Sequence, residues 1–166
     1  MASGSFFGSG SSHAPLQVGD AAPAVAVPAD SGETVDLGAA YGRQEWTLVY
    51  FYPKADTPGC TKQGCSLRDG YAELTRRGVA VFGVSKDGVA AQSAFKAKFR
   101  LPFTLLADTE GKVIAAFGVS TYPVIGMPHR QAYLIRGGKI VYADHKGTTD
   151  EQAAVILRFV EQAGGG

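Results

Sequence analysis

The two cysteines, Cys60 and Cys65, are the residues whose type and spacing point most directly to chemistry. Two thiols are too few for a disulfide scaffold, and in a reducing compartment a close pair is more often catalytic or metal-binding than structural. Cys60 follows a loop that contains Pro53 and Pro58, and a helix is predicted to begin at about Gly59. Unpaired N–H groups and the positive end of a helix dipole lower a thiol pKa from about 8.5 to between ~3.5 and 7.5. This position favours a reactive thiolate over the buried, inert thiol that is usual for a free cysteine.

The spacing between Cys60 and Cys65 conflicts with a disulfide inside an intact helix. Five residues on an ideal helix separate two side chains by about 140° and by a rise of about 7.5 Å. The two Cα atoms then lie roughly 8.7 Å apart, beyond the ~7 Å limit for a disulfide. A bond between them therefore requires the first helical turns to unwind, and Gly64, a poor helix former, is where we expect the helix to open most easily. A packed core thiol is the alternative for Cys65.

Two polar side chains are candidates to assist the Cys60 sulfur. Thr57 lies three residues earlier on the loop, where its hydroxyl can approach the sulfur or an oxygen bound there. Arg130 stands at the start of the predicted strand Gln131–Ile135, and its guanidinium is an always-charged fork of donors that stabilises a thiolate and an oxyanion together. A solvated surface arginine is the alternative reading. The neighbouring His129 should point the opposite way, because consecutive side chains on a strand alternate.

Metal and cofactor chemistry find little support in the sequence. A C-x₄-C spacing is at the edge of the range for zinc, and a zinc site needs two further ligands. His129 and His145 are too far apart for the usual H-x₃₋₅-H pair, and His13 falls in a presumed flexible arm. The sequence also has no G-x-G-x-x-G or Walker loop. We therefore predict neither a metal nor a cofactor.

The composition argues against several broad classes of protein. The 166 residues carry 16 Lys and Arg against 15 Asp and Glu, and a net charge of +1 offers no electrostatic footprint for nucleic acid or an anionic membrane. Hydrophobic residues make up 45%, as in globular domains, and no stretch approaches the ~20 apolar residues of a membrane span. The first residues lack the basic start and apolar centre of a secretory signal, so we expect a cytoplasmic protein.

The chain is predicted to form one domain. Residues 1–15 begin with a Ser/Gly-rich segment and are expected to be a flexible arm, residues 16–163 the domain, and residues 164–166 a disordered tail. Val25–Val27 and Thr34–Leu37 flank a turn cluster and predict an N-terminal β-hairpin.

The rest of the domain alternates strands with helices. Thr47–Tyr52 is a continuous β-branched and aromatic run, typical of a central strand buried on both faces. The other expected elements are a helix at Cys60–Arg77, a strand at Val79–Val84, a helix at Val89–Phe99 starting near Asp87, a strand through Leu106, a short helix at Val113–Phe117, a hairpin of Gln131–Ile135 and Lys139–Tyr142, and a helix capped by Asp150 that ends at Glu161. This order predicts an α/β fold with a mixed central sheet flanked by helices, compatible with a thioredoxin-like fold. Ligands of such sheets bind at the carboxyl ends of the strands, so we expect the site at the loop Pro53–Gly59.

In its motifs the sequence resembles the peroxiredoxins, specifically the peroxiredoxin Q or bacterioferritin comigratory protein group. The most specific match is the P-x-x-x-T-x-x-C loop, which is formed by Pro53, Thr57 and Cys60. Gly19–Pro23 resembles the G-D-x-A-P signature near the family's N-terminus. The resemblance spans roughly residues 17–162, with further matching segments at Ser66–Asp69, Gly83–Asp87, Leu101–Leu106 and Gly118–Val119.

The resemblance implies a thiol-dependent peroxidase, commonly monomeric, that acts on hydrogen peroxide and small organic hydroperoxides. It implies that Cys60 is the peroxidatic cysteine, which attacks the peroxide and becomes a sulfenic acid. Thr57 and Arg130 would polarise the peroxide, and Pro53 would shield the sulfenic acid from water. Cys65 would be the resolving cysteine, which forms an intramolecular disulfide that thioredoxin or a similar dithiol protein reduces.

Two residues near the cysteines depart from the pattern of the group. Gln63 stands where many relatives carry an acidic residue, and Gly64 where a better helix former is common. We hypothesise that the start of this helix unwinds more easily than in typical relatives. Two other functions stay open at this point: a redox-signalling or chaperone-like protein that passes oxidation to a partner, and a structural thioredoxin-like domain with inert thiols.

Overall fold

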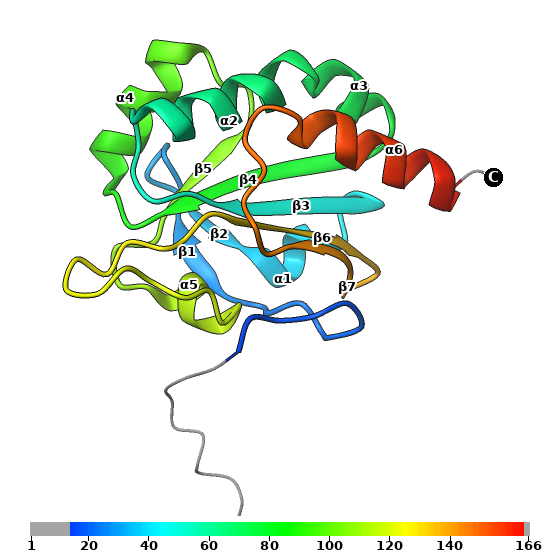
Figure 1. Ribbon diagram of the computed structural model, residues 1–166, viewed down its shortest axis with the longest axis horizontal. Helices are drawn as coiled ribbons and strands as arrows, with labels where there is room; N and C mark the ends of the chain where they lie inside the picture. The colour runs from blue at the N-terminus through cyan, green and yellow to red at the C-terminus, as the bar shows by residue number, and fades with distance from the viewer. Residues whose placement is uncertain (1–13, 165–166) are drawn as a thin grey trace, which may run out of the picture.

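The computed structural model describes residues 14–164, so most of the predicted arm and the last two residues lie outside the described part of the chain. Its centre is a five-stranded sheet with the strand order β5-β4-β3-β6-β7 (Figure 1). The strands are β5 Thr104–Ala107, β4 Val79–Ser85, β3 Trp46–Phe51, β6 Gln131–Arg136 and β7 Lys139–Asp144. The first three run parallel to one another, β6 is antiparallel to β3, and β7 is antiparallel to β6. A separate antiparallel pair, β1 Ala26–Pro28 and β2 Thr34–Asp36, forms the predicted N-terminal hairpin.

Helices cover both faces of the sheet (Figure 1). On one face lie α2 Pro58–Asp69, α3 Tyr71–Arg76, α4 Val89–Phe99 and α6 Gln152–Gly164. On the other face lie the β1-β2 hairpin with α1 Leu37–Ala40 and α5 Lys112–Ala116. This arrangement confirms the predicted thioredoxin-like fold with a mixed central sheet.

The central strand β3 joins the two halves of the core. All six of its residues are buried, because one face packs under α2 and α6 and the other under α5 and the hairpin. Leu48 and Tyr50 belong to the first core cluster, and Val49 and Phe51 to the second. The period-2 alternation of a strand therefore sends large apolar side chains to both faces, as the continuous apolar run predicts.

The single helix predicted at Cys60–Arg77 is wrong, since two helices occupy that segment. The helix is interrupted at Gly70, between α2 and α3. A Cβ atom at this position would lie only 2.7 Å from the Cβ of Ala153 on α6. The close approach of α6 thus requires glycine at the break. The first helix also begins two residues earlier than predicted, because Pro58 takes the first helical position, where its missing N–H is tolerated.

The last helix, α6, also starts later than predicted. It begins at Gln152 rather than directly after Asp150. The carbonyl of Asp150 instead accepts a hydrogen bond from the Ser66 hydroxyl at 3.3 Å, which ties the approach to α6 to the outer face of α2. The short helix α1, which no pattern predicted, begins at an Asp36 side chain that accepts from the Ala39 amide.

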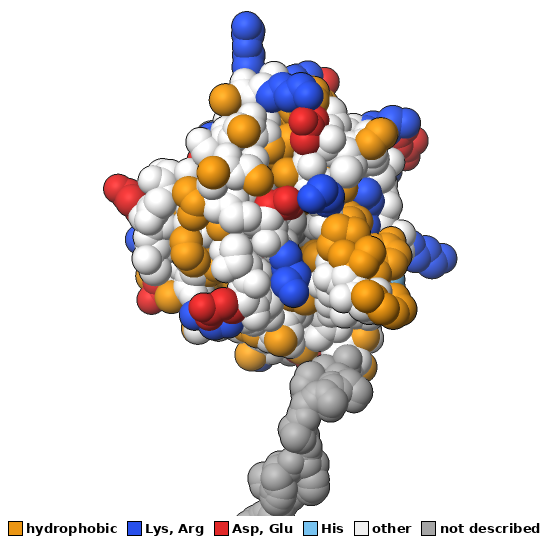
Figure 2. Space-filling view, turned by 90° about the vertical axis from the view of Figure 1, so that its left-hand side faces the viewer, with side chains coloured by type: hydrophobic (Ala, Val, Ile, Leu, Met, Phe, Trp, Pro, Cys, Tyr) orange, Lys and Arg blue, Asp and Glu red, His pale blue; other side chains and the backbone are white. Residues whose placement is uncertain are grey.

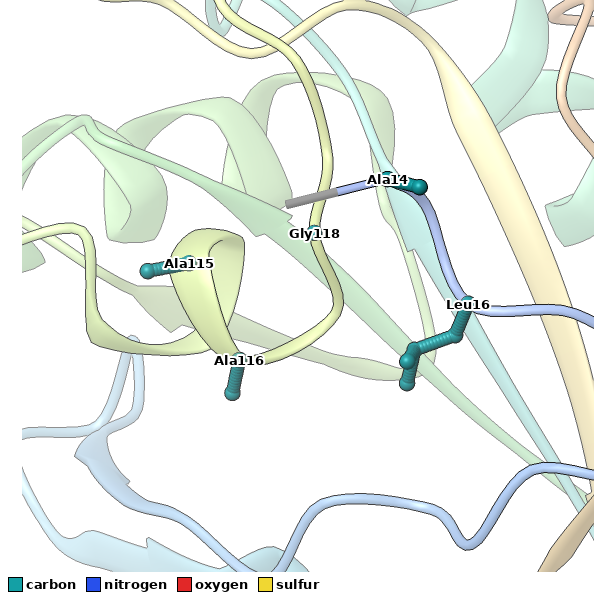
Figure 3. Close-up of a pocket in the computed structure, with 5 residues that line it drawn as sticks. All are labelled: Ala14, Leu16, Ala115, Ala116 and Gly118. Atoms are coloured by element: carbon teal, nitrogen blue, oxygen red, sulfur yellow. The ribbon is translucent and has the colours of Figure 1, made fainter. Parts of the chain in front are cut away.

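The first described residues pack beside α5. The Leu16 amide donates to the Phe117 carbonyl at 3.1 Å, and a Cβ atom at Gly118 would clash with the Ala14 carbonyl. Figure 3 shows the pocket between this segment and α5, which is lined by Ala14, Leu16, Ala115, Ala116 and Gly118. None of these side chains is polar, so this pocket offers no group for catalysis. Among the described residues, no helix is long and apolar enough to cross a membrane.

Candidate active site

Cys60 lies in the first turn of α2, just beyond the carboxyl end of β3. Thr57 precedes the helix in an extended conformation, and its carbonyl accepts the hydrogen bond of the Thr61 amide at 2.8 Å. The loop before it is held to the segment that follows β4 through the Ala55 amide, which donates to the Asp87 carboxylate at 2.8 Å. The Cys60 side chain is only 1% exposed. The strand, loop and helix therefore hold the sulfur in a dry position beside unpaired helical N–H groups.

Arg130 reaches the same sulfur from the neighbouring strand. Gln131 at the start of β6 pairs with Phe51 at the end of β3, so the residue before β6 lies at the edge of the sheet where the active-site loop begins. Arg130 Nη2 lies 3.4 Å from Cys60 Sγ. No ion pair within residues 14–164 involves Arg130, so no carboxylate of this part of the chain neutralises the guanidinium.

A buried chain of amides holds Arg130 in this position. Arg130 Nη1 donates to Gln63 Oε1 at 2.8 Å, and Gln63 Nε2 donates to Gln152 Oε1 at 2.7 Å. Gln152 Nε2 in turn approaches Asp144 at 3.4 Å. Both glutamines are completely buried. This relay connects the first turns of α2 to α6 and β7 and fixes the rotamer of the guanidinium.

Asp144 anchors the far end of the relay. Burial opposes its ionisation, but hydrogen bonds from Thr148, Lys146 and Gly147 outweigh burial and lower the pKa of the carboxyl. Asp144 is therefore a fixed negative charge at neutral pH. Sequence reasoning missed both Asp144 and Gln152, because a lone carboxylate and a lone amide carry no local motif.

Two glycines make room for Arg130. A Cβ atom at Gly59 would lie 2.9 Å from Nη2, and one at Gly147 would lie 2.9 Å from the Arg130 Cβ. Gly147 also has a φ of +89°, which side chains rarely adopt. The Arg130 side chain thus packs with its guanidinium against the N-terminus of α2 and its Cβ and Cδ atoms against the loop after β7.

Thr57 and Pro53 lie on the open side of the site. The Thr57 hydroxyl donates to the Lys54 carbonyl at 2.8 Å, which leaves the oxygen lone pairs free to accept. Both residues line a pocket together with Lys54, Tyr122, Pro123, Ile125 and Met127. Figure 2, which faces the side where the chain before β6 projects in Figure 1, shows exposed hydrophobic side chains gathered beside lysine and arginine side chains. Tyr122, Val124 and Ile125 are the large hydrophobic residues exposed in this loop.

Two further residues singled out in the sequence are Cys65 and His129. Cys65 is a free, half-buried thiol on α2, and the helix runs unbroken through both cysteines. His129 turns away from the sulfur: its Nδ1 lies 2.6 Å from the Ser120 hydroxyl and its ring packs edge-on against Tyr122. Pro53, Thr57, Cys60 and Arg130 therefore lie at the same end of the sheet, and Cys65 lies about 1.4 turns further along the same helix.

Comparison with known proteins gives the class to which this fold and site belong. The AhpC/TSA family model matches residues 18–143, most of the chain. The chain belongs to this family.

Individual relatives narrow the class. Peroxiredoxin Bcp of Escherichia coli K12 is 41% identical over 157 residues, which cover 89% of this chain and 97% of the relative. The chloroplastic peroxiredoxin Q of Oryza sativa subsp. japonica is 41% identical over 125 residues, 75% of this chain and 57% of the relative. A structure of the Xanthomonas campestris bacterioferritin comigratory protein, described for its alkyl peroxide reduction activity, matches with a TM-score of 0.78 at 26% identity over 91% of this chain and 99% of that one. The resemblance to the peroxiredoxin Q and Bcp group is confirmed, and with it the class of thiol peroxidase.

Proposed function

We propose that this protein reduces hydrogen peroxide and organic hydroperoxides through Cys60, with Cys65 as the resolving thiol and thioredoxin or a similar dithiol protein as the reductant. The observation that carries the proposal is the 3.4 Å contact between Arg130 Nη2 and Cys60 Sγ at the start of α2. A buried sulfur that faces an arginine donor is suited to nucleophilic attack on a peroxide.

In the first step the Cys60 thiolate attacks the terminal oxygen of the peroxide. The S–O bond forms as the O–O bond breaks. The departing oxygen takes up from the solvent the proton that the Cys60 thiol released on ionising, and it leaves as water or an alcohol. The Arg130 guanidinium, one nitrogen of which already faces the sulfur, stabilises the negative charge as it moves to the departing oxygen. The Thr57 hydroxyl oxygen accepts a hydrogen bond from the peroxide O–H group, and Pro53 shields the resulting sulfenic acid from water.

The pocket beside Thr57 favours substrates with an apolar part. Its lining is largely apolar, because Pro53, Tyr122, Pro123, Ile125 and Met127 share it with Lys54 and Thr57. An alkyl hydroperoxide can place its carbon chain on this surface and its O–O group toward the sulfur. The alkyl peroxide reduction named for the Xanthomonas campestris relative supports the same substrate class.

In the second step the Cys65 thiol attacks the sulfenic acid, and a disulfide and one water are formed. The intact α2 keeps the two cysteines beyond disulfide reach, so its first turns must unwind in each cycle. Unwinding breaks the bond between Gln63 and Arg130, which loosens the relay at the same time. The dithiol reductant then returns both cysteines to thiols and α2 rewinds.

All five catalytic side chains of this proposal come from a single chain. The cycle therefore requires no second copy, and we expect it to run in a monomer. We propose a cytoplasmic location, because the cycle returns both cysteines to thiols and a reducing compartment favours that state.

Replacing Cys65 by serine tests the proposed route of resolution. We expect Cys65→Ser to consume one equivalent of peroxide at a rate within about threefold of the wild type and then to stop when thioredoxin is the only reductant. A rapid-quench peroxide assay measures both phases. Addition of a small thiol in excess should restart turnover, which shows that the stalled protein is folded and holds a sulfenic acid. Sustained turnover with thioredoxin at the wild-type rate would mean that another thiol resolves Cys60.

A further inference from the structure

Tyr50, in the middle of β3, carries a buried hydroxyl that has no hydrogen-bond partner among the described residues. Its side chain is 0% exposed. Burial raises the pKa of Tyr50 well above its ordinary value, so the hydroxyl keeps its proton. An O–H group that has left water without finding an acceptor destabilises the conformation that buries it.

The other buried tyrosines of the core show that this is an exception. Tyr52 donates to Gln92 Oε1 at 2.5 Å, and Tyr133 donates to Gln131 Oε1 at 2.5 Å. Tyr41 donates to the Pro23 carbonyl at 2.8 Å. Each of these hydroxyls is satisfied by a nearby acceptor, whereas that of Tyr50 is not.

The Tyr50 hydroxyl is covered by the part of α2 that joins the two cysteines. Gly83 pairs with Tyr50 on β4 and lets the ring lie across that strand, because a Cβ atom there would be 2.9 Å from the hydroxyl oxygen. On the helix side, a Cβ atom at Gly64 would lie 3.8 Å from the same oxygen. Gly64 is buried and directly precedes Cys65. The turn that must open before the cysteines can bond is therefore the turn that seals this hydroxyl from water.

We propose that Tyr50 biases the start of α2 toward unwinding, because its hydroxyl is unpaired while these turns are wound and reaches water when they leave the sheet. This inference rests on the proposed function, since it assigns a cause to the unwinding that resolution by Cys65 requires. Tyr50 is then a positioning residue that acts through the helix. The hydrogen bond between Gln63 and Arg130 has the opposite effect, because it stabilises the wound helix. The balance between this hydrogen bond and the unpaired Tyr50 hydroxyl sets how long the sulfenic acid stays in the wound form, where it is exposed to further oxidation.

The variant Tyr50→Phe isolates the hydroxyl, because it keeps the ring and removes one oxygen atom. We expect amide protection of residues 61–65 in the reduced protein to rise about tenfold, which corresponds to ~1.4 kcal/mol. Formation of the Cys60–Cys65 disulfide, followed by quenched alkylation and mass spectrometry, should slow by the same factor. The rate of the first step with peroxide should stay within about twofold, so the fraction of Cys60 oxidised beyond sulfenic acid should rise.

Tyr41→Phe is the matched control, because it removes a satisfied hydroxyl from the other side of the sheet. It should lower the midpoint of denaturant unfolding and leave disulfide formation within about twofold of the wild type. A Tyr50→Phe protein that is less stable than the wild type, or that forms the disulfide at the wild-type rate, would overturn the role of Tyr50 alone. Absence of a Cys60–Cys65 disulfide in the oxidised wild type would instead overturn the proposed route of resolution together with this inference.

Discussion

Cys60→Ser is expected to reduce the rate of peroxide consumption by at least about 10³-fold, to the background of uncatalysed reduction. Cys60 is the only sulfur in contact with the guanidinium of Arg130 within the described chain, and a serine hydroxyl at the same place is not ionised at neutral pH. The side chains are nearly isosteric, so the fold should be unchanged. A stopped-flow peroxide assay measures the loss.

Cys65→Ser serves as the matched control for this loss. It removes the other thiol of the same helix and should retain a full first turnover. A Cys60→Ser protein that keeps more than about a tenth of the wild-type rate would remove Cys60 from the role of attacking nucleophile, whatever the behaviour of Cys65→Ser.

Arg130→Met is expected to lower the second-order rate constant for oxidation of Cys60 by about 10²- to 10³-fold. The substitution keeps an unbranched apolar chain but removes the donors that face Cys60 and Gln63. It also leaves the buried Gln63 Oε1 without its donor, so we expect a loss of about 1–3 kcal/mol in the free energy of unfolding. Arg130→Lys should fall between the two proteins, because lysine supplies the charge without the two-pronged geometry.

Arg136→Met, at the far end of β6, is the control for general effects of removing an arginine. Arg136 ends β6 opposite Trp46 at the start of β3, whereas Arg130 lies at the other end of these strands. It packs over the Trp46 ring and pairs with the exposed Glu45. Its loss should leave the rate constant within about twofold of the wild type. If Arg130→Met reacted with peroxide within about threefold of the wild type while remaining folded, the guanidinium would have no part in the chemical step.

The position of the site could be predicted because its main signals are local. The apolar run that ends at Pro53 predicts a central strand, and the proline-containing loop that follows predicts a helix with Cys60 at its N-terminus. The structure has both. The hairpin of Gln131–Ile135 and Lys139–Tyr142 was predicted for the same reason, and the structure joins its strands through Gly137 and Gly138, which both have positive φ. Short-range steric and hydrogen-bonding preferences decide such features, so they can be read from neighbouring residues.

The hydrogen bonds that hold Arg130 in place could not be predicted, because they join residues far apart in sequence. Gln63 and Gln152 are 89 positions apart, and their bond exists only once α2 and α6 pack together. The break at Gly70 likewise follows from contact with Ala153 on α6 rather than from the helical pattern of the segment itself. The unpaired hydroxyl of Tyr50 could not be predicted either, because every residue of Thr47–Tyr52 is typical of a buried strand and none indicates which polar atoms find a partner.

The account depends on α2 being wound when Cys60 meets peroxide and unwound when Cys60 meets Cys65. Hydrogen–deuterium exchange of the amides of residues 61–65, compared between the reduced protein and the protein oxidised with one equivalent of peroxide, tests this most directly. We predict measurable protection in the reduced protein, lower than that of the rest of the core, and its near-complete loss in the disulfide form, while the amides of α4 and β3 keep theirs. Equal protection of residues 61–65 in both forms, with the Cys60–Cys65 disulfide verified by peptide mapping, would contradict the account.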